Sequence, residues 1–275
     1  MHLPADLHVH TTFSDSTLTP EEVIGRCVAN HVGTVAITDH DALAGVGPAT
    51  EVGREAGVRV VPGGELTAYD GPTEIHILGL FIDPEDRTLR AVIELARQVR
   101  YSRVAKIVRR LRALDVRISS DEVLEVAGSG VPGRMHVAQA LVNLGQVASI
   151  QDAFKYYLGN QGPAYAPKHQ LSPAEAAAAI HSAGGVSVVA HPGVGLPDAL
   201  VREMVREGIR GIEVYHPLHS TEYVQRYLRL AAELGALVSG GSDSHGGVRK
   251  ETHIGSVLID DELVERIEQE ARARR

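Results

Sequence analysis

The feature that most constrains the fold of this chain is the alternation of short apolar runs with helical segments. Residues 34–40 form a β-branched, apolar run that ends in Asp and His, and residues 186–191 form another that ends in His. A helical segment follows Thr19, where Pro and Glu occupy the positions that favour a helix start. Strands that alternate with helices pair in parallel, so the sequence predicts an α/β fold.

Ionisable residues stand at the ends of most of these runs. About seven strands are expected, and about six of them carry His, Asp or Glu at or just after the carboxyl end, where parallel α/β barrels build their active sites. His76 differs, because it lies within the run 74–80, where a histidine is more often a buried core residue. Core packing gives no reason for ionisable groups at strand ends, so we expect these side chains to meet in one cavity. They are His8, His10, Asp15, His40, Glu65, His76, His191, Asp243 and His245.

These nine side chains suit divalent metal ions. His8 and His10 are two residues apart in an extended strand, so both point to one face, and Asp15 follows after a short polar turn. Nitrogen and oxygen donors without thiolate suit Mn, Fe or Zn, and the single Cys27 excludes an internal disulfide and a multi-cysteine zinc site. Nine donors exceed the needs of one ion, so we expect two or three divalent ions, with Glu65 as a bridge.

The composition sets limits on partners and location. With 44% hydrophobic residues, the 275 residues can bury the core of one large domain, with or without an insertion. The formal net charge of −8 argues against generic binding to long duplex nucleic acid, which needs a basic surface, whereas bound cations would still attract a small anionic substrate. No apolar run approaches the roughly 20 residues of a membrane-spanning helix. We expect a cytoplasmic protein without signal peptide or membrane segment, and its oligomeric state stays open.

Between residues 83 and 170 the alternation stops and the pattern becomes helical. Residues 89–114 form a long amphipathic segment whose apolar face includes Leu95 and whose other face carries seven basic residues. Such a run of charge is usually a solvated helix face; the alternative is a groove for the phosphates of a longer substrate. The sequence thus predicts a metal-binding barrel of residues 1–82 and 171–275, with residues 83–170 inserted as a small helical cap domain.

Six ordered motifs cover nearly the whole chain outside this insert. They read D-L-H-V-H-T-T-F-S-D, A-I-T-D-H-D, G-G-E, H-I-L-G-L, A-H-P-G and G-S-D-S-H. In these motifs the chain resembles the polymerase and histidinol phosphatase (PHP) family. The resemblance implies a distorted (β/α)7 barrel with a trinuclear metal centre. It also implies three ligand sets: His8, His10, Glu65 and Asp243; Glu65, His76 and His191; and Asp15, His40 and His245.

The insert indicates which group of PHP proteins the chain resembles most. Segments 133–145 and 153–165 resemble those of stand-alone PHP phosphoesterases that act on nucleoside 3′,5′-bisphosphates and on the 5′ ends of short RNAs. In those relatives an Arg-x-His element faces the metal site and binds the substrate phosphate, which implies catalytic and substrate-binding roles for Arg134 and His136. His169 lies near a further matching substrate-binding position. A guanidinium can hold a phosphate through two hydrogen bonds; without the resemblance, Arg134 would be interpreted as a surface arginine at a helix start.

Two positions depart from the family pattern. Ser16 follows Asp15 where Gly is usual, and Ser244 stands where the last motif usually has Phe. Neither change removes a ligand, but both bear on how the base or sugar of the substrate is held. His216 and His219 are additional histidines near the site end of a strand, where supporting or incidental roles fit better than ligation.

These features predict metal-dependent hydrolysis of a phosphomonoester on a small nucleotide or a short 5′-phosphorylated RNA. A hydroxide bridging two ions would attack phosphorus, Arg134 would neutralise phosphate oxygens, and His191 would assist the leaving alkoxide. A Ser-His-Asp triad is the rival within enzymes, but the chain has no Gly-x-Ser-x-Gly elbow. Two alternatives stay open: a histidinol-phosphate phosphatase, against which the Arg-x-His insert speaks, and a non-catalytic, metal-stabilised binding module.

Overall fold

The computed structural model describes residues 4–128, 132–166, 171–246 and 252–274. The chain divides into two compact units: unit 1 comprises residues 1–93 and 170–275, and unit 2 comprises residues 94–169. The helix α3 (Arg87–Arg112) begins in unit 1 and continues in unit 2. That residues 83–170 act as a cap domain stays a prediction.

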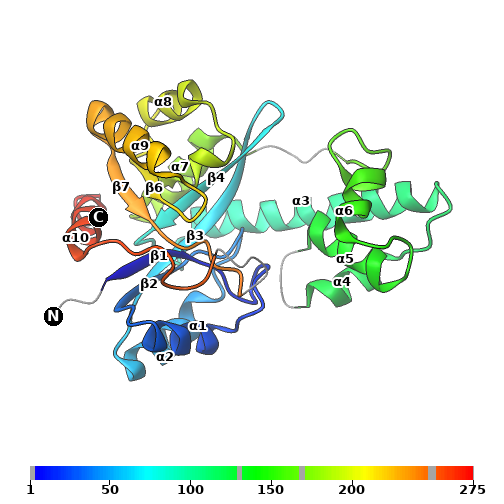
Figure 1. Ribbon diagram of the computed structural model, residues 1–275, viewed down its shortest axis with the longest axis horizontal. Coiled ribbons are helices and arrows are strands. Elements are labelled where there is room, and N and C mark those ends of the chain that lie inside the picture. Colours follow the sequence, from blue (N-terminus) through cyan, green and yellow to red (C-terminus); the bar gives the residue numbers. More distant parts are fainter. Residues whose placement is uncertain (1–3, 129–131, 167–170, 247–251, 275) are drawn as a thin grey trace. The chain divides into compact units, whose positions relative to one another are not determined.

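Unit 1 is built on a seven-stranded sheet whose strands lie side by side in sequence order (Figure 1). The strands are β1 (Ala5–Val9), β2 (Thr34–Ile37), β3 (Arg59–Asp70), β4 (Thr73–Leu80), β5 (Val186–Val189), β6 (Gly211–Tyr215) and β7 (Leu237–Gly240). The pairs β1–β2, β2–β3, β5–β6 and β6–β7 are parallel. Strands β2 and β5 are buried along their whole length, as expected of short apolar runs in a parallel sheet. The predicted α/β class is therefore confirmed.

The expectation that the strands are uniformly parallel is wrong at β4, which runs antiparallel to both β3 and β5. Only Gly71 and Pro72 separate β3 from β4, whereas a parallel partner would need a crossover of about a dozen or more residues. Gly71 has a φ of 53°, a left-handed conformation that glycine adopts at little cost in a tight turn. As a result, His76 lies in the amino-terminal half of its strand, opposite Thr67.

Hydrogen bonds also join β1 to the segment that follows β7. The backbone N–H of His10 donates to the carbonyl of Ser244, with 3.1 Å between N and O, and the N–H of Asp243 donates to the carbonyl of His8 at 2.9 Å. Predicted ligands from the two ends of the chain are thereby neighbours. Closure of the sheet into the distorted (β/α)7 barrel stays a prediction.

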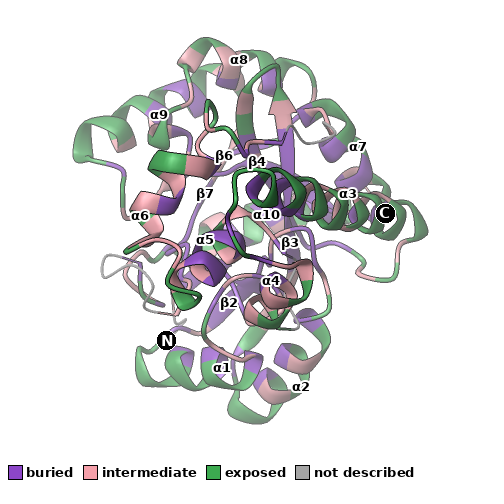
Figure 2. Ribbon diagram, turned by 90° about the vertical axis from the view of Figure 1, so that its right-hand side faces the viewer, coloured by how far each residue is buried: buried purple, intermediate pink, exposed green. Residues whose placement is uncertain are grey.

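Helices flank the strands of unit 1 and turn their exposed faces outward, while the strands between them are buried (Figure 2). They are α1 (Pro20–Ala29), α2 (Val46–Ala56), α7 (Pro173–Ser182), α8 (Asp198–Arg206), α9 (Thr221–Leu234) and α10 (Asp261–Arg272). The helix start predicted at Thr19 is present as a capping box with Glu22. None of the described helices is long and apolar enough to cross a membrane.

Unit 2 is helical. After α3 it contains α4 (Ser120–Ala127), α5 (Arg134–Asn143), α6 (Ile150–Ala153) and a π-helical turn over Phe154–Leu158. Its core is apolar and includes the buried side chains of Ile107, Leu111 and Leu141. The predicted apolar face of segment 89–114 is correct at Val104, Ile107, Val108 and Leu111, which are buried, but wrong at Leu95 and Leu114, which are 55% and 43% exposed.

Candidate metal centre

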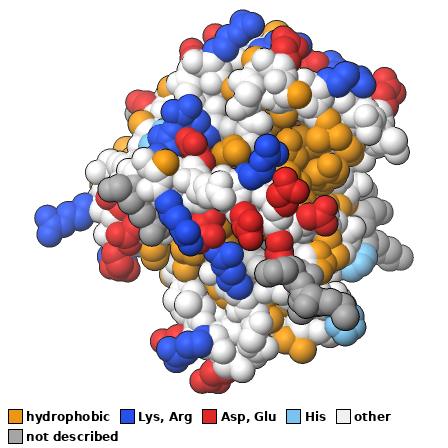
Figure 3. All heavy atoms as spheres, turned by 90° about the vertical axis from the view of Figure 1, so that its left-hand side faces the viewer, with side chains coloured by type: hydrophobic (Ala, Val, Ile, Leu, Met, Phe, Trp, Pro, Cys, Tyr) orange, Lys and Arg blue, Asp and Glu red, His pale blue; other side chains and the backbone are white. Residues whose placement is uncertain are grey.

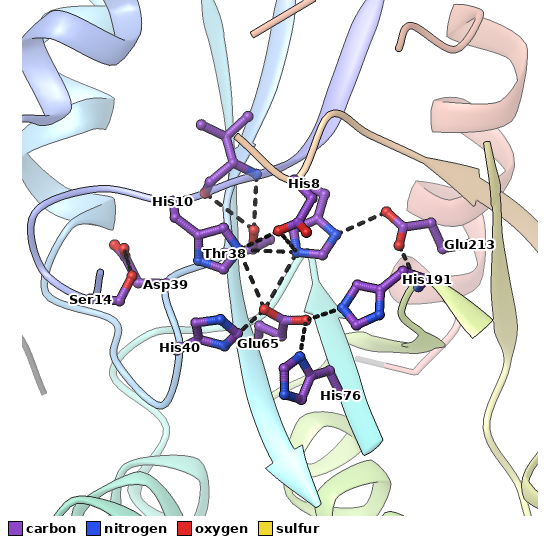
Figure 4. A network of polar contacts seen from close by, with 12 residues as sticks. His8, His10, Ser14, Thr38, Asp39, His40, Glu65, His76, His191 and Glu213 are labelled. Carbon is purple, nitrogen blue, oxygen red and sulfur yellow. Dashed lines mark hydrogen bonds and ion pairs between the residues drawn. The ribbon is translucent and has the colours of Figure 1, made fainter. Parts of the chain in front are cut away.

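The structure brings the nine predicted ligand side chains of unit 1 together. His8 lies on β1 and His10 at its end, while Glu65 and His76 lie on facing strands of the β3–β4 hairpin. The others follow strand ends: Asp15 after β1, His40 after β2, His191 after β5, and Asp243 and His245 after β7. Figure 4 shows His8, His40, His76 and His191 pointing toward Glu65 from different elements.

Glu65 is the centre of this cluster. Its side chain is wholly buried, and its two oxygens face different histidines. Oxygen Oε2 lies 2.9 Å from Nδ1 of His40 and 3.4 Å from Nε2 of both His8 and His10. Oxygen Oε1 lies 3.1 Å from Nδ1 of His76 and 3.3 Å from Nε2 of His191. One carboxylate is therefore shared by five imidazoles.

Two further carboxylates complete the cluster. Oδ1 of Asp243 lies 3.2 Å from Nε2 of His10 and 3.4 Å from Nε2 of His8. Oδ1 of Asp15 lies 3.2 Å from Nε2 of His245, and its Oδ2 lies 4.0 Å from Nε2 of His40. Every predicted ligand thus has another predicted ligand within 4.0 Å.

Possible ligand atoms form three groups, in each of which all such atoms lie within 4.8 Å of one another. These groups are His8, His10 and Asp243; His40, Glu65 and His76; and His10, Asp15, His40 and His245. They differ from the sets implied by the resemblance in three ways. Glu65 is absent from the group of His8, His10 and Asp243; His40 replaces His191 beside Glu65 and His76; and His10 joins the group of Asp15. The assignment of individual residues to individual ions stays a prediction.

Unpaired buried atoms test whether this cluster fits divalent ions. Among the described residues, buried atoms without a hydrogen-bond partner include Nδ1 of His10, His40 and His76, Oδ1 of Asp15 and Oε2 of Glu65. Several of them approach a neighbouring ligand atom closely, yet not in the alignment of a hydrogen bond. Buried polar atoms are costly without partners. Their convergence is what a cation between them would satisfy, so the donor set fits.

The electrostatics of the cluster keep its carboxylates charged. Burial opposes the ionised form of Glu65, but the neighbouring His40, His76 and His8 outweigh it and hold the pKa of Glu65 well below its usual range. Burial is likewise outweighed at Asp15, chiefly by His40, and at Asp243, chiefly by His8, so both carboxyl pKa values are also lowered. Ionised carboxylates are the state that cation binding requires.

The histidines divide into two kinds. Burial, with a further contribution from the neighbouring imidazoles of His245 and His40, lowers the pKa of His10 to about 3. Burial also lowers the pKa of His191. At His76, by contrast, Glu65 outweighs burial and raises the pKa to about 10. Imidazoles with raised and with lowered pKa values thus surround the same carboxylates, and a bound cation would replace the protons of the raised ones.

Glu213 on β6 is a carboxylate beside the cluster that is not among the predicted ligands. It is wholly buried, its Oε1 lies 2.9 Å from Nδ1 of His8, and its Oε2 accepts a hydrogen bond from the backbone N–H of His191 at 2.6 Å. The signal was available, because Glu213 is a carboxylate near the end of an apolar strand, like the residues that were selected.

His216 and His219, the two additional histidines, lie in different surroundings. Nε2 of His216 lies 3.4 Å from Oδ2 of Asp243, so His216 borders the cluster. His219 contacts only backbone in the hydrogen bonds observed for it: Nδ1 lies 2.8 Å from the carbonyl of Val214, and Nε2 accepts from the N–H of Gly193 at 3.0 Å. The two histidines therefore stand in different positions with respect to the ligands.

Arg134 and His136 lie in unit 2, on the first turn of α5. The Arg134 guanidinium donates to Oδ1 of Asn160 at 2.8 Å, and lies 5.8 Å from the ring centroids of Phe154 and Tyr165. Nδ1 of His136 accepts from the backbone N–H of Gly133 at 3.0 Å. Their predicted approach to the metal centre stays a prediction, and His169 lies outside the described residues.

A second concave surface on unit 1 has a different character. It is lined mainly by apolar residues of α9, β7 and α10, among them Leu228, Leu237 and Leu263, with Arg266 as its one charged lining residue within the described part of the chain. Figure 3 shows hydrophobic side chains gathered on the face where α9 and α10 lie. Among the described residues that line this groove, none is a histidine, cysteine or carboxylate.

Comparisons with known proteins agree with this chemistry. A family model described as PHP domain matches residues 6–157. The 3′,5′-nucleoside bisphosphate phosphatase of Chromobacterium violaceum is 32% identical over 246 residues, which are 87% of this chain and 86% of that protein. The 5′-3′ exoribonuclease Rnm of Salmonella typhimurium is 37% identical over 190 residues, 68% of this chain but only 65% of that protein, just under two thirds of its length.

The fold has a solved counterpart as well. A structure from Bifidobacterium adolescentis, of a proposed metal-dependent phosphoesterase, is similar with a TM-score of 0.87 and 34% sequence identity. The similarity covers 97% of this chain and 96% of that one.

Proposed function

Because this chain belongs to the PHP domain family and is a metal-dependent hydrolase, we propose that it removes phosphate from a small nucleotide. The proposed substrate is a nucleoside 3′,5′-bisphosphate or the 5′ end of a short RNA. The activities named for the Chromobacterium and Salmonella relatives support this choice, as does the resemblance of segments 133–145 and 153–165 to enzymes of that kind.

The observation that carries the proposal is the Glu65 carboxylate. Its two oxygens face separate groups of imidazoles, so one side chain can bridge two cations. When bound, divalent ions would lower the pKa of a coordinated water towards neutrality and neutralise phosphate oxygens. We propose Mn, Fe or Zn, held by the nine clustered side chains.

The side chains themselves set the charge and geometry of the site. Glu65, Asp15 and Asp243 stay ionised at neutral pH because imidazoles surround them. His191 is kept neutral by burial, which suits a ligand better than a proton donor. We therefore propose that His191 is a metal ligand. It assists the leaving alkoxide only when its imidazole is protonated.

Arg134 and His136 are proposed to bind the substrate phosphate. The guanidinium is oriented by Asn160 and lies near two aromatic rings, so little rotamer freedom is lost when a phosphate binds. His169 keeps the same proposed role with no structural argument of its own.

The test is phosphate release by the purified protein with Mn²⁺, comparing adenosine 3′,5′-bisphosphate, AMP, histidinol phosphate and a 5′-phosphorylated RNA trimer. We expect the bisphosphate or the RNA to be hydrolysed fastest. Arg134→Lys should then raise KM for that substrate, since an ammonium cannot reproduce a bidentate grip. Preference for histidinol phosphate would refute the nucleotide proposal and leave the metal centre standing, whereas no turnover with Mn, Fe or Zn would favour the binding-module alternative.

A further inference from the structure

Strand β6 supplies none of the nine predicted ligands, yet its end places two buried ionisable side chains behind them. Glu213 lies within β6, and His216 follows the strand directly. Glu213 is fully buried and His216 is 3% exposed. Both contact ligand side chains or ligand backbone, and neither is used by the proposed hydrolysis.

Glu213 determines which nitrogen of His8 carries a proton. Its Oε1 lies 2.9 Å from Nδ1 of His8, and since a carboxylate only accepts, Nδ1 is the donor. When His8 is neutral, as a metal ligand must be, the lone pair is on the other nitrogen, Nε2, which lies 3.1 Å from Nε2 of His10. Two nitrogens that face one another at this distance suit a shared cation, and the carboxylate–imidazole pair fixes the orientation of the ring.

His216 holds Asp243 by similar logic. Nδ1 of His216 accepts a hydrogen bond from the backbone N–H of Leu218 at 3.2 Å, so in the neutral ring the proton is on Nε2. Nε2 lies 3.4 Å from Oδ2 of Asp243, which leaves Oδ1 of that carboxylate facing His8 and His10.

The backbone supports the same interpretation. Of the nine predicted ligands, all of them described, only His191 and Asp243 have a positive φ, 30° and 51°. Such conformations are costly for residues other than glycine, and persist where surrounding contacts determine them. Oε2 of Glu213 accepts from the N–H of His191 at 2.6 Å, and His216 contacts the side chain of Asp243. Each strained ligand is thus held by one of the two residues.

We propose that Glu213 and His216 are positioning residues of the metal centre. Glu213 selects the His8 tautomer that can bind a cation and fixes the backbone of His191, while His216 orients the Asp243 carboxylate. The inference rests on the proposed metal-binding role of the cluster, but not on the identity of the substrate.

The first test is Glu213→Gln, with Mn²⁺ binding measured by titration calorimetry and by metal analysis. Glutamine has one acceptor and one donor. If its oxygen keeps the His191 N–H, its NH₂ group faces Nδ1 of His8 and selects the tautomer whose protonated Nε2 cannot bind a metal. We expect roughly 10- to 100-fold weaker Mn²⁺ binding, with the unfolding temperature in EDTA close to that of the wild type.

The matched control is His181→Gln, which alters a half-buried histidine of unit 1 whose Nε2 lies 2.9 Å from Oγ of Ser187. It should bind Mn²⁺ like the wild type. Wild-type affinity in Glu213→Gln would overturn the inference, as would equal losses in Glu213→Gln and His181→Gln.

A second pair of variants decides the question if Glu213→Gln does not fold. The amide NH₂ of His216→Gln can replace the Nε2–H donor, whereas His216→Leu removes it. The inference predicts near wild-type Mn²⁺ affinity for His216→Gln and roughly tenfold or greater loss for His216→Leu. Equal behaviour of the two variants would overturn it.

The binding measurements also separate this inference from the proposed function. A wild-type protein that binds Mn²⁺ but hydrolyses none of the four phosphate esters would refute the proposed substrate and leave the positioning roles testable as above. A wild-type protein that binds no divalent ion would overturn both.

Discussion

Unit 1 contains two sets of carboxylates that differ in what surrounds them. Asp15, Glu65 and Asp243 face histidine nitrogens, several of them out of hydrogen-bond alignment. Asp6 and Asp39 face backbone N–H groups and hydroxyls instead. Asp39 accepts from the N–H and hydroxyl of Thr11, both at 2.7 Å, and from the hydroxyl of Ser14 at 2.6 Å. Asp6 accepts from the N–H groups of Ser242 and Gly255 at 2.8 and 3.0 Å.

The two sets, here called cluster carboxylates and anchor carboxylates, have pKa values shifted in opposite directions. At Glu65 the surrounding imidazoles outweigh burial and lower the pKa of the carboxyl group. At the anchor carboxylates the neutral hydrogen-bond donors do not compensate for burial, so the pKa of Asp39 is raised and that of Asp6 is raised to about 6. A buried carboxylate is therefore not evidence of a metal site by itself. The difference lies in whether its partners are fixed donors or other ligand atoms.

The largest expected effect comes from breaking the cluster. Glu65→Gln removes the charge that five imidazoles share, so Mn²⁺-dependent phosphate release should fall by at least about 100-fold. Chelation of the wild type by EDTA should have the same effect, and added Mn²⁺ should restore activity only in the wild type. Circular dichroism checks that the variant is folded. Activity that survives both treatments would mean that the chemistry does not depend on this cluster.

Removing an anchor carboxylate should lower the stability of the fold and leave metal binding nearly unchanged. Asp39→Ala removes the acceptor of the Thr11 N–H and hydroxyl and leaves the Ser14 hydroxyl with only its longer contact to the Thr11 carbonyl, at 3.4 Å. This change should cost about 2–4 kcal/mol of unfolding free energy. Urea unfolding in EDTA measures this cost, and metal analysis should find close to the wild-type number of bound ions. Loss of the ions without loss of stability would place Asp39 among the ligands and erase the distinction between the two sets.

Much of this arrangement was predictable because it depends on local pattern. The α/β class follows from short apolar runs between helices, and the gathering of His10, His40 and His191 follows from their places just after strand ends. Glu65 was expected beyond the end of its strand but lies within β3, which continues to Asp70 and pairs there with β4. The antiparallel direction of β4 also had a signal, the two-residue turn of Gly71 and Pro72, which excludes a crossover.

Other features depend on partners that are distant in sequence. Asp39 and His40 are neighbours after the same strand, but one is an anchor and the other faces Glu65. The roles of Asp39 and His40 differ because Asp39 lies beside Thr11, whereas His40 lies beside Glu65. Glu213 shares the strand-end signal of the predicted ligands, and what distinguishes it from them is its contacts with Nδ1 of His8 and the N–H of His191, which come from other parts of the chain.

A smaller effect is expected in the pH dependence of stability, which the anchor carboxylate Asp6 should influence. The pKa of Asp6 is about 6 in the folded protein against a usual value of 3.8, so the folded state binds this proton more tightly than the unfolded state. As pH rises from about 4 to about 6, the wild type should lose stability relative to Asp6→Asn, by a few kcal/mol at most. Urea midpoints in EDTA at several pH values test this; a difference that does not change with pH would contradict the raised pKa.

The smallest expected effect concerns Cys27, close to the anchors in the same unit. Burial, with a further contribution from the nearby charge of Asp6, raises the pKa of this thiol to about 12. The thiolate is the reactive form, so a disulfide reagent at pH 8 should label the native protein very slowly and the urea-unfolded protein rapidly. Removing the metal should not change the native rate, because Cys27 packs in the apolar core with Val23 and Val35 rather than against the cluster. If EDTA did accelerate labelling, bound metal would be stabilising the core around Cys27 as well as the cluster. The stability of that core would then depend on metal, although Cys27 lies with the anchor carboxylates rather than with the cluster carboxylates.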